Sequence, residues 1–244
     1  MAKGKLLETG INHLAIIPDG NRRWARRRKL PIKLGHYQGI KKAKEIMQMV
    51  FEETDIKYLT FYGFSLYNFD REETEKHPLF YKMADISKKI EEWVPEGVGI
   101  MTVGDLSEFE QYELPDSGGA KPSNLKALFE STKRPSESGK YLTLLIGYDG
   151  VDEIEKAADR LLDAQARGEQ VSGKNLWDHT YTSELPPADL MIRTGNEERI
   201  SGFVPYLISY SELHFDKKMW PAFGKKRLKR ILKQYSRRNR RLGK

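Results

Sequence analysis

A carboxylate and several arginines directly follow a short apolar run near the start of the chain. Residues 14–17 are all apolar, and Pro18, Asp19 and Gly20 precede a basic stretch that begins at Asn21. This order predicts a strand, a turn and a helix. Free backbone N–H groups gather where a helix begins, and the Asp19 carboxylate can hold a divalent cation above them. The segment therefore has the composition of a metal and phosphate site.

The arginines of this segment add the chemistry of anion binding. Arg22 and Arg23 follow Asn21, and a guanidinium group can bind anionic oxygens with two hydrogen bonds. The same residues also fit an ordinary strand-to-helix turn with a capping Asn21 and a solvated basic face. This segment alone leaves both interpretations open.

A second segment far downstream repeats the arrangement. Residues 190–192 are apolar, and the loop that follows carries Arg193, Gly195, Arg199 and Ser201. The simpler alternative for its arginines is a surface ion-pair network with the two glutamates between them. Loops that follow parallel strands line one crevice at the carboxyl ends of the strands, where such folds bind ligands. The two segments together therefore predict a shared anion-binding crevice.

Apolar runs alternate along the chain with stretches of helical periodicity. The predicted strands are Leu14–Ile17, Tyr58–Tyr62, Gly99–Val103, Leu142–Ile146, Leu190–Ile192 and Val204–Ile208. The predicted helices are Tyr37–Phe51, Pro78–Val94, Ser123–Glu130, Val151–Ala166 and Lys225–Arg238. This alternation predicts a mostly parallel sheet of about six strands, flanked by helices. The 244 residues fit a single α/β domain, 1–244, with a full core.

Composition excludes several classes of site and protein. The chain has no cysteine, which excludes disulfides, thiolate metal sites and a cysteine nucleophile. No apolar run is long enough to span a bilayer, and residues 1–10 lack the apolar core of a signal peptide. We therefore expect a soluble cytoplasmic protein.

The net charge of +7 is concentrated at the carboxyl end. Eleven of the 42 Lys and Arg residues lie in the tail 225–244, which has no acidic residue, so the remainder carries 31 basic against 35 acidic residues. Apolar residues recur at helical spacing within this tail. It fits a solvated helix face, a peripheral contact with an anionic membrane, or an RNA contact.

A series of motifs in this order resembles the cis-prenyltransferases, the Z-type prenyl diphosphate synthases such as undecaprenyl diphosphate synthase. The resemblance covers nearly the whole chain. Its motifs are residues 13–24, Gly35-His36, Phe64-Ser65 with Asn68 and Arg71, Gly104-Asp105, residues 189–195, 199–201 and 210–213, and Trp220-Pro221. Each motif is weak alone, but the set in this order is highly specific.

The resemblance implies a Mg²⁺-dependent enzyme that condenses an allylic prenyl diphosphate with isopentenyl diphosphate. Diphosphate is released and a cis double bond is left. By resemblance, Asp19 and Glu212 serve the metal. The residues implied to hold the allylic diphosphate are Gly20, Asn21, Arg22, Arg23, Trp24 and His36.

The acceptor side is implied in the same way. Arg193, Arg199 and Ser201 match the residues that hold isopentenyl diphosphate. Those implied to lie by the reacting carbons, with Asp19, are Ser65, Asn68 and Arg71. The proton acceptor is not assigned by the resemblance.

Two further segments gain a function from the resemblance. One face of the helix predicted at 78–94 carries Leu79, Met83, Ile86, Ile90 and Trp93. Such a stripe is typical of plain core, and in the family the corresponding helix lines a hydrophobic tunnel for the growing chain. Arg241 and Gly243 match a terminal Arg-x-Gly element, which implies a homodimer whose tail reaches into the partner's site.

Several positions depart from the family's motifs. They are Ile32 in place of Arg, Tyr67 and Phe69 in place of Glu and Trp, Glu72 in place of Pro, Gly147, Asp149 and Val151 in place of Asn, Gly and Arg, and Gly202 in place of Asn. The departures lie near the residues implied to surround the allylic substrate and the reacting carbons, rather than at those implied to bind diphosphate. They therefore predict an altered product or linkage more than a loss of activity.

Simpler interpretations remain for two of the motif residues. His36 follows a glycine and can cap a helix in its neutral form. Asp105 can close a turn after a strand.

Three functions from different classes follow. The first is a cis-prenyltransferase, with a non-head-to-tail linkage or a different acceptor as its variant. The second is a non-catalytic partner subunit, which the presence of Asp19, Arg193, Arg199 and Glu212 disfavours. The third is a nucleic-acid-binding domain, suggested by the pI of about 9.3 and the basic tail; no binding motif supports it, so we expect no nucleic-acid partner.

Overall fold

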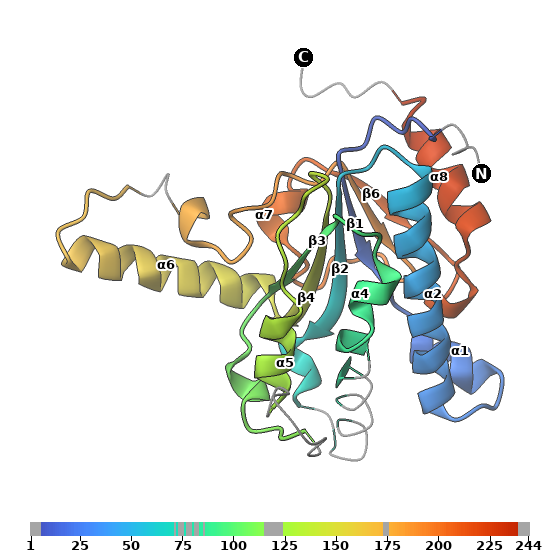
Figure 1. Ribbon diagram of the computed structural model, residues 1–244, viewed down its shortest axis with the longest axis horizontal. Coiled ribbons are helices and arrows are strands. Elements are labelled where there is room, and N and C mark those ends of the chain that lie inside the picture. The colour runs from blue at the N-terminus through green and yellow to red at the C-terminus, as the bar shows by residue number, and fades with distance from the viewer. Residues whose placement is uncertain are drawn as a thin grey trace.

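The structure is a computed structural model that describes residues 6–70, 86–114, 124–172 and 176–238, together with residues 72, 76, 80, 83 and 84. The chain folds around a six-stranded sheet in which all neighbouring strands run parallel (Figure 1). The strands are β1 (His13–Ile17), β2 (Tyr58–Ser65), β3 (Gly99–Val103), β4 (Tyr141–Tyr148), β5 (Leu190–Arg193) and β6 (Glu212–Phe215). Their order across the sheet is β3-β4-β2-β1-β5-β6. The predicted α/β architecture is confirmed.

Helices cover both faces of this sheet. They are α1 (Asn21–Arg27), α2 (Ile32–Glu53), α4 (Ile90–Trp93), α5 (Leu125–Ser131), α6 (Gly150–Ala166), α7 (Pro205–Ile208) and α8 (Lys225–Tyr235), with 3₁₀ turns η1 (Leu66–Asn68), η2 (Ser107–Phe109), η4 (Trp177–His179) and η5 (Trp220–Ala222). Figure 1 shows α2 and α8 along one side of the sheet and α6 extending away from it. Within the described residues, no helix is both long and apolar enough to cross a bilayer.

Burial on both faces explains the continuous apolar run of β1. Leu14 and Ile16 pack into the core beneath α2, α4 and α8. Ala15 and Ile17 point to the opposite face and pack into the core that includes α7. All five residues of β1 are buried, so the turn that follows the strand starts from a fixed position.

The sixth strand differs from the prediction. The apolar segment Val204–Ile208, predicted as a strand, forms α7 instead. Val204 has a φ of 33°, and Pro205 occupies the first helical turn, where its missing N–H costs nothing. A proline at this position could not donate to a sheet ladder. The strand that completes the sheet is β6, which begins at Glu212.

The predicted helices are found with shifted ends. The helix α2 begins at Ile32 rather than Tyr37, so Gly35 and His36 lie inside it and neither caps its start. The helix predicted at 78–94 falls largely outside the described residues, and its described end forms α4. The other three are α5, α6 and α8, whose ends differ from the predictions by up to three residues.

Two glycines allow α2 to approach α1 closely. A Cβ added at Gly35 would lie 2.2 Å from Asn21 O, and one at Gly39 would lie 2.2 Å from Asn21 Oδ1. The carbonyl of Gly39 also accepts a 2.8 Å hydrogen bond from Trp220 Nε1. These contacts hold the start of α1 against the carboxyl end of β1, where Asp19 lies.

Candidate active site

The larger of two adjoining cavities lies at the carboxyl ends of β1, β2, β4 and β5. Its volume is about 810 Å³. Ten residues predicted for the site line it: Asp19, Gly20, Asn21, Arg22, Arg23, His36, Ser65, Asn68, Arg193 and Ser201. The loops after β1 and β5 thus share one cavity, as their positions after parallel strands predict.

The backbone around Asp19 is fixed from two sides. Its carbonyl oxygen accepts hydrogen bonds from Thr194 Oγ1 at 2.8 Å and from Trp220 N at 2.9 Å. The next residue, Gly20, has a φ of 107°, and a Cβ there would lie 2.9 Å from the Cβ of Met219. Only glycine adopts this turn without strain. The turn therefore presents the Asp19 side chain in a defined direction.

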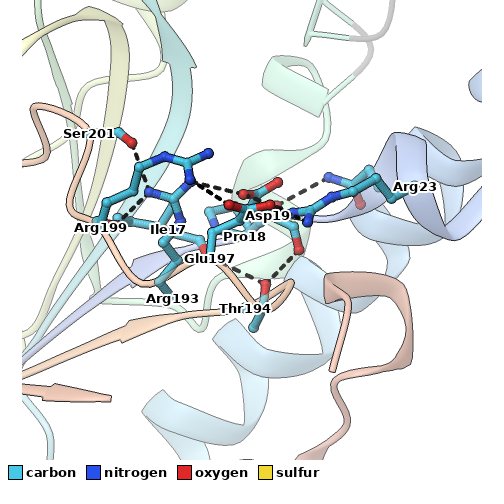
Figure 2. Close-up of polar contacts among 10 residues, drawn as sticks. Ile17, Pro18, Asp19, Arg23, Arg193, Thr194, Glu197, Arg199 and Ser201 are labelled. Atoms are coloured by element: carbon cyan, nitrogen blue, oxygen red, sulfur yellow. Dashed lines mark hydrogen bonds and ion pairs between the residues drawn. The ribbon is translucent and has the colours of Figure 1, made fainter. Parts of the chain in front are cut away.

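Asp19 joins the two arginine-bearing loops through ion pairs (Figure 2). Its Oδ2 accepts a hydrogen bond from Arg193 Nη2 at 3.0 Å and lies 3.2 Å from Arg23 Nη2. Glu197 pairs with Arg23 and also, at 2.5 Å, with Arg199. Carboxylates thus orient the guanidinium groups at the cavity in the way that an anionic ligand would.

Arg193 is held by its own loop as well as by Asp19. Its side chain is only 6% exposed, and Nη1 donates to Arg199 O at 2.5 Å and to Ser201 Oγ at 2.8 Å. Ser201 has a φ of 49°, a left-handed conformation that costs a non-glycine residue roughly 1–3 kcal/mol. The hydrogen bonds to Arg193 help to hold this strained loop, so the guanidinium and the hydroxyl are positioned before any ligand arrives.

Sequence reasoning missed two polar residues on the cavity wall. Tyr62 in β2 donates its hydroxyl to Tyr148 O at 3.1 Å, and burial raises the pKa of Tyr62 to about 12. Its phenol therefore stays protonated at neutral pH. Asp149 follows β4 directly and is 5% exposed. The signal for Asp149 was its position after an apolar strand, the same position that identified Asp19.

The smaller cavity, about 160 Å³, is mainly apolar and shares part of its wall with the larger one. The two have Pro18, Asn21, His36, Tyr62 and Gly63 in common. Four residues of the predicted helix stripe line the smaller cavity: Met83, Ile86, Ile90 and Trp93. The fifth, Leu79, lies outside the described residues. These four residues therefore line a hollow and also pack into the hydrophobic core.

Glu212 does not join Asp19 in this chain. In the register of the sheet, Glu212 pairs with Leu190, whereas Ile17 pairs with Arg193. Three residues of strand, about 10 Å at ~3.3 Å per residue, separate these two levels. Glu212 instead pairs with Arg238. The implied metal site that uses both carboxylates is therefore not formed within one chain.

Two other predicted residues lie off the cavity wall, and three cannot be placed. Trp24 packs under the guanidinium of Arg28, 4.3 Å from the ring centre. The side chain of Arg199 is 62% exposed and reaches the site through Glu197 and through its own carbonyl. Outside the described residues are Arg71, Arg241 and Gly243.

Asp105 has a structural partner instead of a site role. It pairs with Lys156 of α6 and accepts a hydrogen bond from Ser107 N at 2.9 Å. Burial opposes ionisation of Asp105, but these hydrogen bonds outweigh it and lower its pKa to about 2. The interpretation of Asp105 as a residue that stabilises a turn fits this geometry.

The departures from the family motifs divide into two groups. Tyr67, Asp149, Val151 and Gly202 line the larger cavity. Phe69 instead packs among aromatic rings, with ring centres 5.0 Å from Phe64 and 4.9 Å from Phe109. Ile32, at the start of α2, is not part of either cavity wall. Only the first group can change the shape and charge of the site directly.

Comparisons with known proteins agree with the resemblance. A prenyltransferase family model described as "Putative undecaprenyl diphosphate synthase" matches residues 17–243. An isoprenyl transferase of Staphylococcus saprophyticus is 37% identical over 237 residues, 95% of this chain and 89% of that protein. A (2E,6E)-farnesyl-diphosphate-specific ditrans,polycis-undecaprenyl-diphosphate synthase of Micrococcus luteus is 32% identical over 237 residues, 95% of this chain and 90% of that protein.

A solved structure extends the comparison to three dimensions. Lavandulyl diphosphate synthase from Lavandula x intermedia, in complex with dimethylallyl diphosphate, superimposes with a TM-score of 0.84. The match covers 97% of this chain and 99% of that chain, at 26% sequence identity.

Proposed function

This chain belongs to the undecaprenyl diphosphate synthase family of prenyltransferases, and we propose that it condenses an allylic prenyl diphosphate with isopentenyl diphosphate to give a cis-configured prenyl diphosphate. One observation carries the proposal. Two arginine-bearing strand-end loops meet at Asp19 in a polar cavity that adjoins an apolar one. A diphosphate needs the first environment and a hydrocarbon chain needs the second.

The loop after β1 is proposed to bind the allylic diphosphate. Arg22 and Arg23 supply guanidinium groups, and Asn21 and His36 lie where the polar cavity meets the apolar one. A substrate whose diphosphate lies on the arginines would direct its hydrocarbon chain past His36 toward the smaller cavity. At about 160 Å³, that cavity would serve as the start of the tunnel.

The loop after β5 is proposed to bind isopentenyl diphosphate. Arg193 and Ser201 face the cavity, and Arg199 lies at its edge beside Glu197. Ser65 and Asn68, at the end of β2 and in η1, line the same cavity and are proposed to lie by the reacting carbons. Binding of a diphosphate here would replace the carboxylate partners of the arginines.

Asp19 also fits a role in holding Mg²⁺. Within the described residues no group of three His, Asp or Glu side chains forms a metal site, so a protein-only cage is not available. Mg²⁺ is commonly held by one or two carboxylates together with substrate phosphates and water. The Oδ1 atom of Asp19 has no hydrogen-bond partner among the described residues. When bound, Mg²⁺ would offset the charge that develops on the departing diphosphate.

Ionisation of the allylic diphosphate sets the demands on this site. The C1–O bond breaks and its electron pair leaves with the diphosphate. Preformed donors that face the departing anion in a water-poor cavity stabilise this step without reorganisation. Arg22, Arg23 and Arg193 are among the arginines that line this cavity and are placed to do so.

The departures on the cavity wall support a variant of this function. Tyr67, Asp149, Val151 and Gly202 reshape the wall, and the structural neighbour is named as a lavandulyl diphosphate synthase. A non-head-to-tail linkage, or a different acceptor, is therefore the second candidate. A non-catalytic role is not favoured, because Asp19, Arg193 and Ser201 are all present and are joined by hydrogen bonds at the cavity.

The expected assembly is a homodimer at the cytoplasmic surface of a membrane. The basis for the dimer is the terminal Arg241 and Gly243. The basis for the membrane contact is α8, where Lys226, Arg230 and Lys233 make no ion pair within the described residues. The opposite face of α8 is buried in the core, so the contact would be electrostatic rather than inserted.

Substitution of Asp19 tests the proposed chemistry. Asp19→Asn should lower kcat for condensation by about a hundredfold or more, because it removes a term that stabilises charge in the transition state. Asp159→Asn on the exposed side of α6 is the matched control and should leave kcat unchanged. Normal Mg²⁺-dependent turnover of Asp19→Asn, with both variants folded, would remove Asp19 from the mechanism.

A further inference from the structure

A second carboxylate, Asp149, is built into the cavity wall opposite the loop after β1. It follows β4 and caps α6, where its Oδ1 accepts hydrogen bonds from Val151 N at 2.9 Å and Asp152 N at 3.4 Å. The residue is only 5% exposed, yet it lines the larger cavity. The helix cap accounts for the position and hydrogen bonds of one carboxylate oxygen, Oδ1.

The other oxygen, Oδ2, has no hydrogen-bond partner among the described residues. It lies over Gly202, where an added Cβ would come within 2.4 Å of it. Gly202 has a φ of 68°, and its carbonyl accepts a 2.8 Å hydrogen bond from Gly150 N. The loop after β5 is thus shaped around the carboxylate, and only glycine leaves room for it.

The position of Gly202 places this oxygen on the acceptor side of the cavity. Gly202 directly follows Ser201, whose hydroxyl accepts from Arg193. Tyr62, which donates to the carbonyl of Tyr148, completes this part of the wall. A ligand that lies on Arg193 and Ser201 therefore has the free oxygen of Asp149 beside it.

The other groups on the wall are poorly suited to accept a proton there. Among the described residues, the cavity wall has two carboxylates, Asp19 and Asp149. Asp19 is paired with two guanidinium groups, those of Arg193 and Arg23, and is the residue proposed to hold Mg²⁺, so its carboxylate already has cationic partners. Tyr62 is a phenol that is already protonated. His36 lies on the other side of the cavity, in α2.

We propose that Asp149 is the general base of this enzyme and accepts the proton that isopentenyl diphosphate loses. The inference rests on the proposed function. As the allylic C1–O bond breaks, the C3=C4 π pair of isopentenyl diphosphate forms the new bond from C4 to C1 and leaves a cation at C3. Asp149 Oδ2 takes a proton from C2, and the C2–H pair becomes the C2=C3 double bond. The carboxylate becomes a carboxylic acid, which returns its proton to solvent after product release.

Asp149→Asn tests this role with little disturbance of the fold. An Asn side chain has nearly the same volume, and its Oδ1 can accept the same two N–H groups at the start of α6. Asp152→Asn is the matched control, because it removes a charge from the same helical turn but lies off the cavity wall. Both variants should melt close to the wild-type temperature.

The readout is condensation of isopentenyl diphosphate that carries either hydrogen or deuterium at C2. In Asp149→Asn, kcat should fall by about a hundredfold or more and the deuterium effect on kcat should rise above the wild-type value, because proton loss becomes slow. The control should match the wild type in both. A kcat near the wild-type value, or a reduced kcat with an unchanged deuterium effect, would overturn the proposal.

Gly202→Ala gives an independent test that keeps the carboxylate. Its Cβ would displace Oδ2, so kcat should fall and the deuterium effect should rise in the same direction. Full activity of Gly202→Ala would count against the proposal. Failure of the wild-type protein to use isopentenyl diphosphate would overturn the proposed function itself, whereas an active wild type with an equally active Asp149→Asn variant would overturn only the role of Asp149.

Discussion

Among single residues, substitution of Arg193 gives a more specific test than substitution of the other arginines, because three acceptors already surround its guanidinium group. It donates to Asp19, Arg199 and Ser201 at the same time. Lysine keeps the charge but has no planar fork, so Arg193→Lys cannot reproduce this set. Loss of one charge-assisted hydrogen bond, about 1.5–3 kcal/mol, corresponds to a KM for isopentenyl diphosphate that is roughly 10–100 times higher.

Steady-state kinetics with each substrate varied in turn checks this assignment. Arg27→Lys, at the exposed end of α1, is the matched control. If only the KM for the allylic substrate rises in Arg193→Lys, the division of the two diphosphates between the loops is wrong.

The sequence could predict those site residues that lie at the end of a recognisable strand, because a strand followed by a turn fixes where the backbone places them. Asp19 and Arg193 stand directly after apolar runs, so strand and loop signals place both at one edge of the sheet. Asp149 has the same position, but the family motifs mark it only as a departure. Its fit over Gly202 is a contact across 53 residues of sequence, which no local pattern encodes.

At the scale of elements, a buried histidine links the stability of β1 to pH. His13 lies between Pro186 O at 2.7 Å and Thr60 Oγ1 at 2.8 Å; since a carbonyl can only accept, Nδ1 carries the proton of the neutral ring. Burial lowers the pKa of His13 from 6.5 to about 4. Between these values the unfolded chain binds the extra proton and the folded chain does not, so stability is lost as pH falls from about 6.5 to 4.

Urea unfolding at several pH values measures this loss. Two and a half pKa units correspond to about 3 kcal/mol at most. The wild type should lose free energy of unfolding over this pH range, and His13→Gln should lose less. An equal pH dependence in both proteins would show that another group is responsible.

The predictions of helices and strands were correct where burial of apolar side chains determined the structure. They were wrong where the backbone conformation of particular residues determined it. Five of the six strands were found because strands buried on both faces read as continuous apolar runs. Val204–Ile208 carries the same signal but contains Pro205 and a left-handed Val204, and it forms α7. The true last strand, Glu212–Phe215, lies at the edge of the sheet and is only partly buried, so its sequence lacks an apolar run.

At the scale of the whole molecule, the proposed dimer predicts that the terminal residues serve the partner's site. Deletion of residues 240–244 should lower kcat sharply with little loss of thermal stability. Mixing the truncated protein with full-length Asp19→Ala should restore part of the activity, because a mixed dimer contains one intact body with one intact tail. Harmless truncation, or mixed dimers without recovered activity, would contradict this shared site.

The basic face of α8 predicts binding to anionic vesicles. Each exposed cation near such a surface contributes about 1 kcal/mol, and salt screens the attraction. Reversal of charge at Lys226, Arg230 and Lys233 should therefore abolish sedimentation with phosphatidylglycerol vesicles and leave condensation in solution intact. Retained binding by this variant, or preferential binding of the wild type to RNA, would exclude a membrane role for α8.

The proposed reaction joins an allylic group to isopentenyl diphosphate. The direct measurement is incubation of the purified protein with radiolabelled isopentenyl diphosphate, Mg²⁺ and a panel of allylic diphosphates, followed by chromatography and determination of the linkage and double-bond geometry of each product. We expect Mg²⁺-dependent incorporation of label into prenyl diphosphates with a cis double bond, together with a short or differently linked product that reflects the altered wall at Tyr67 and Asp149. If no allylic partner leads to incorporation of label, the proposed function is wrong; a single ladder of long cis chains would show that the altered wall does not change the product.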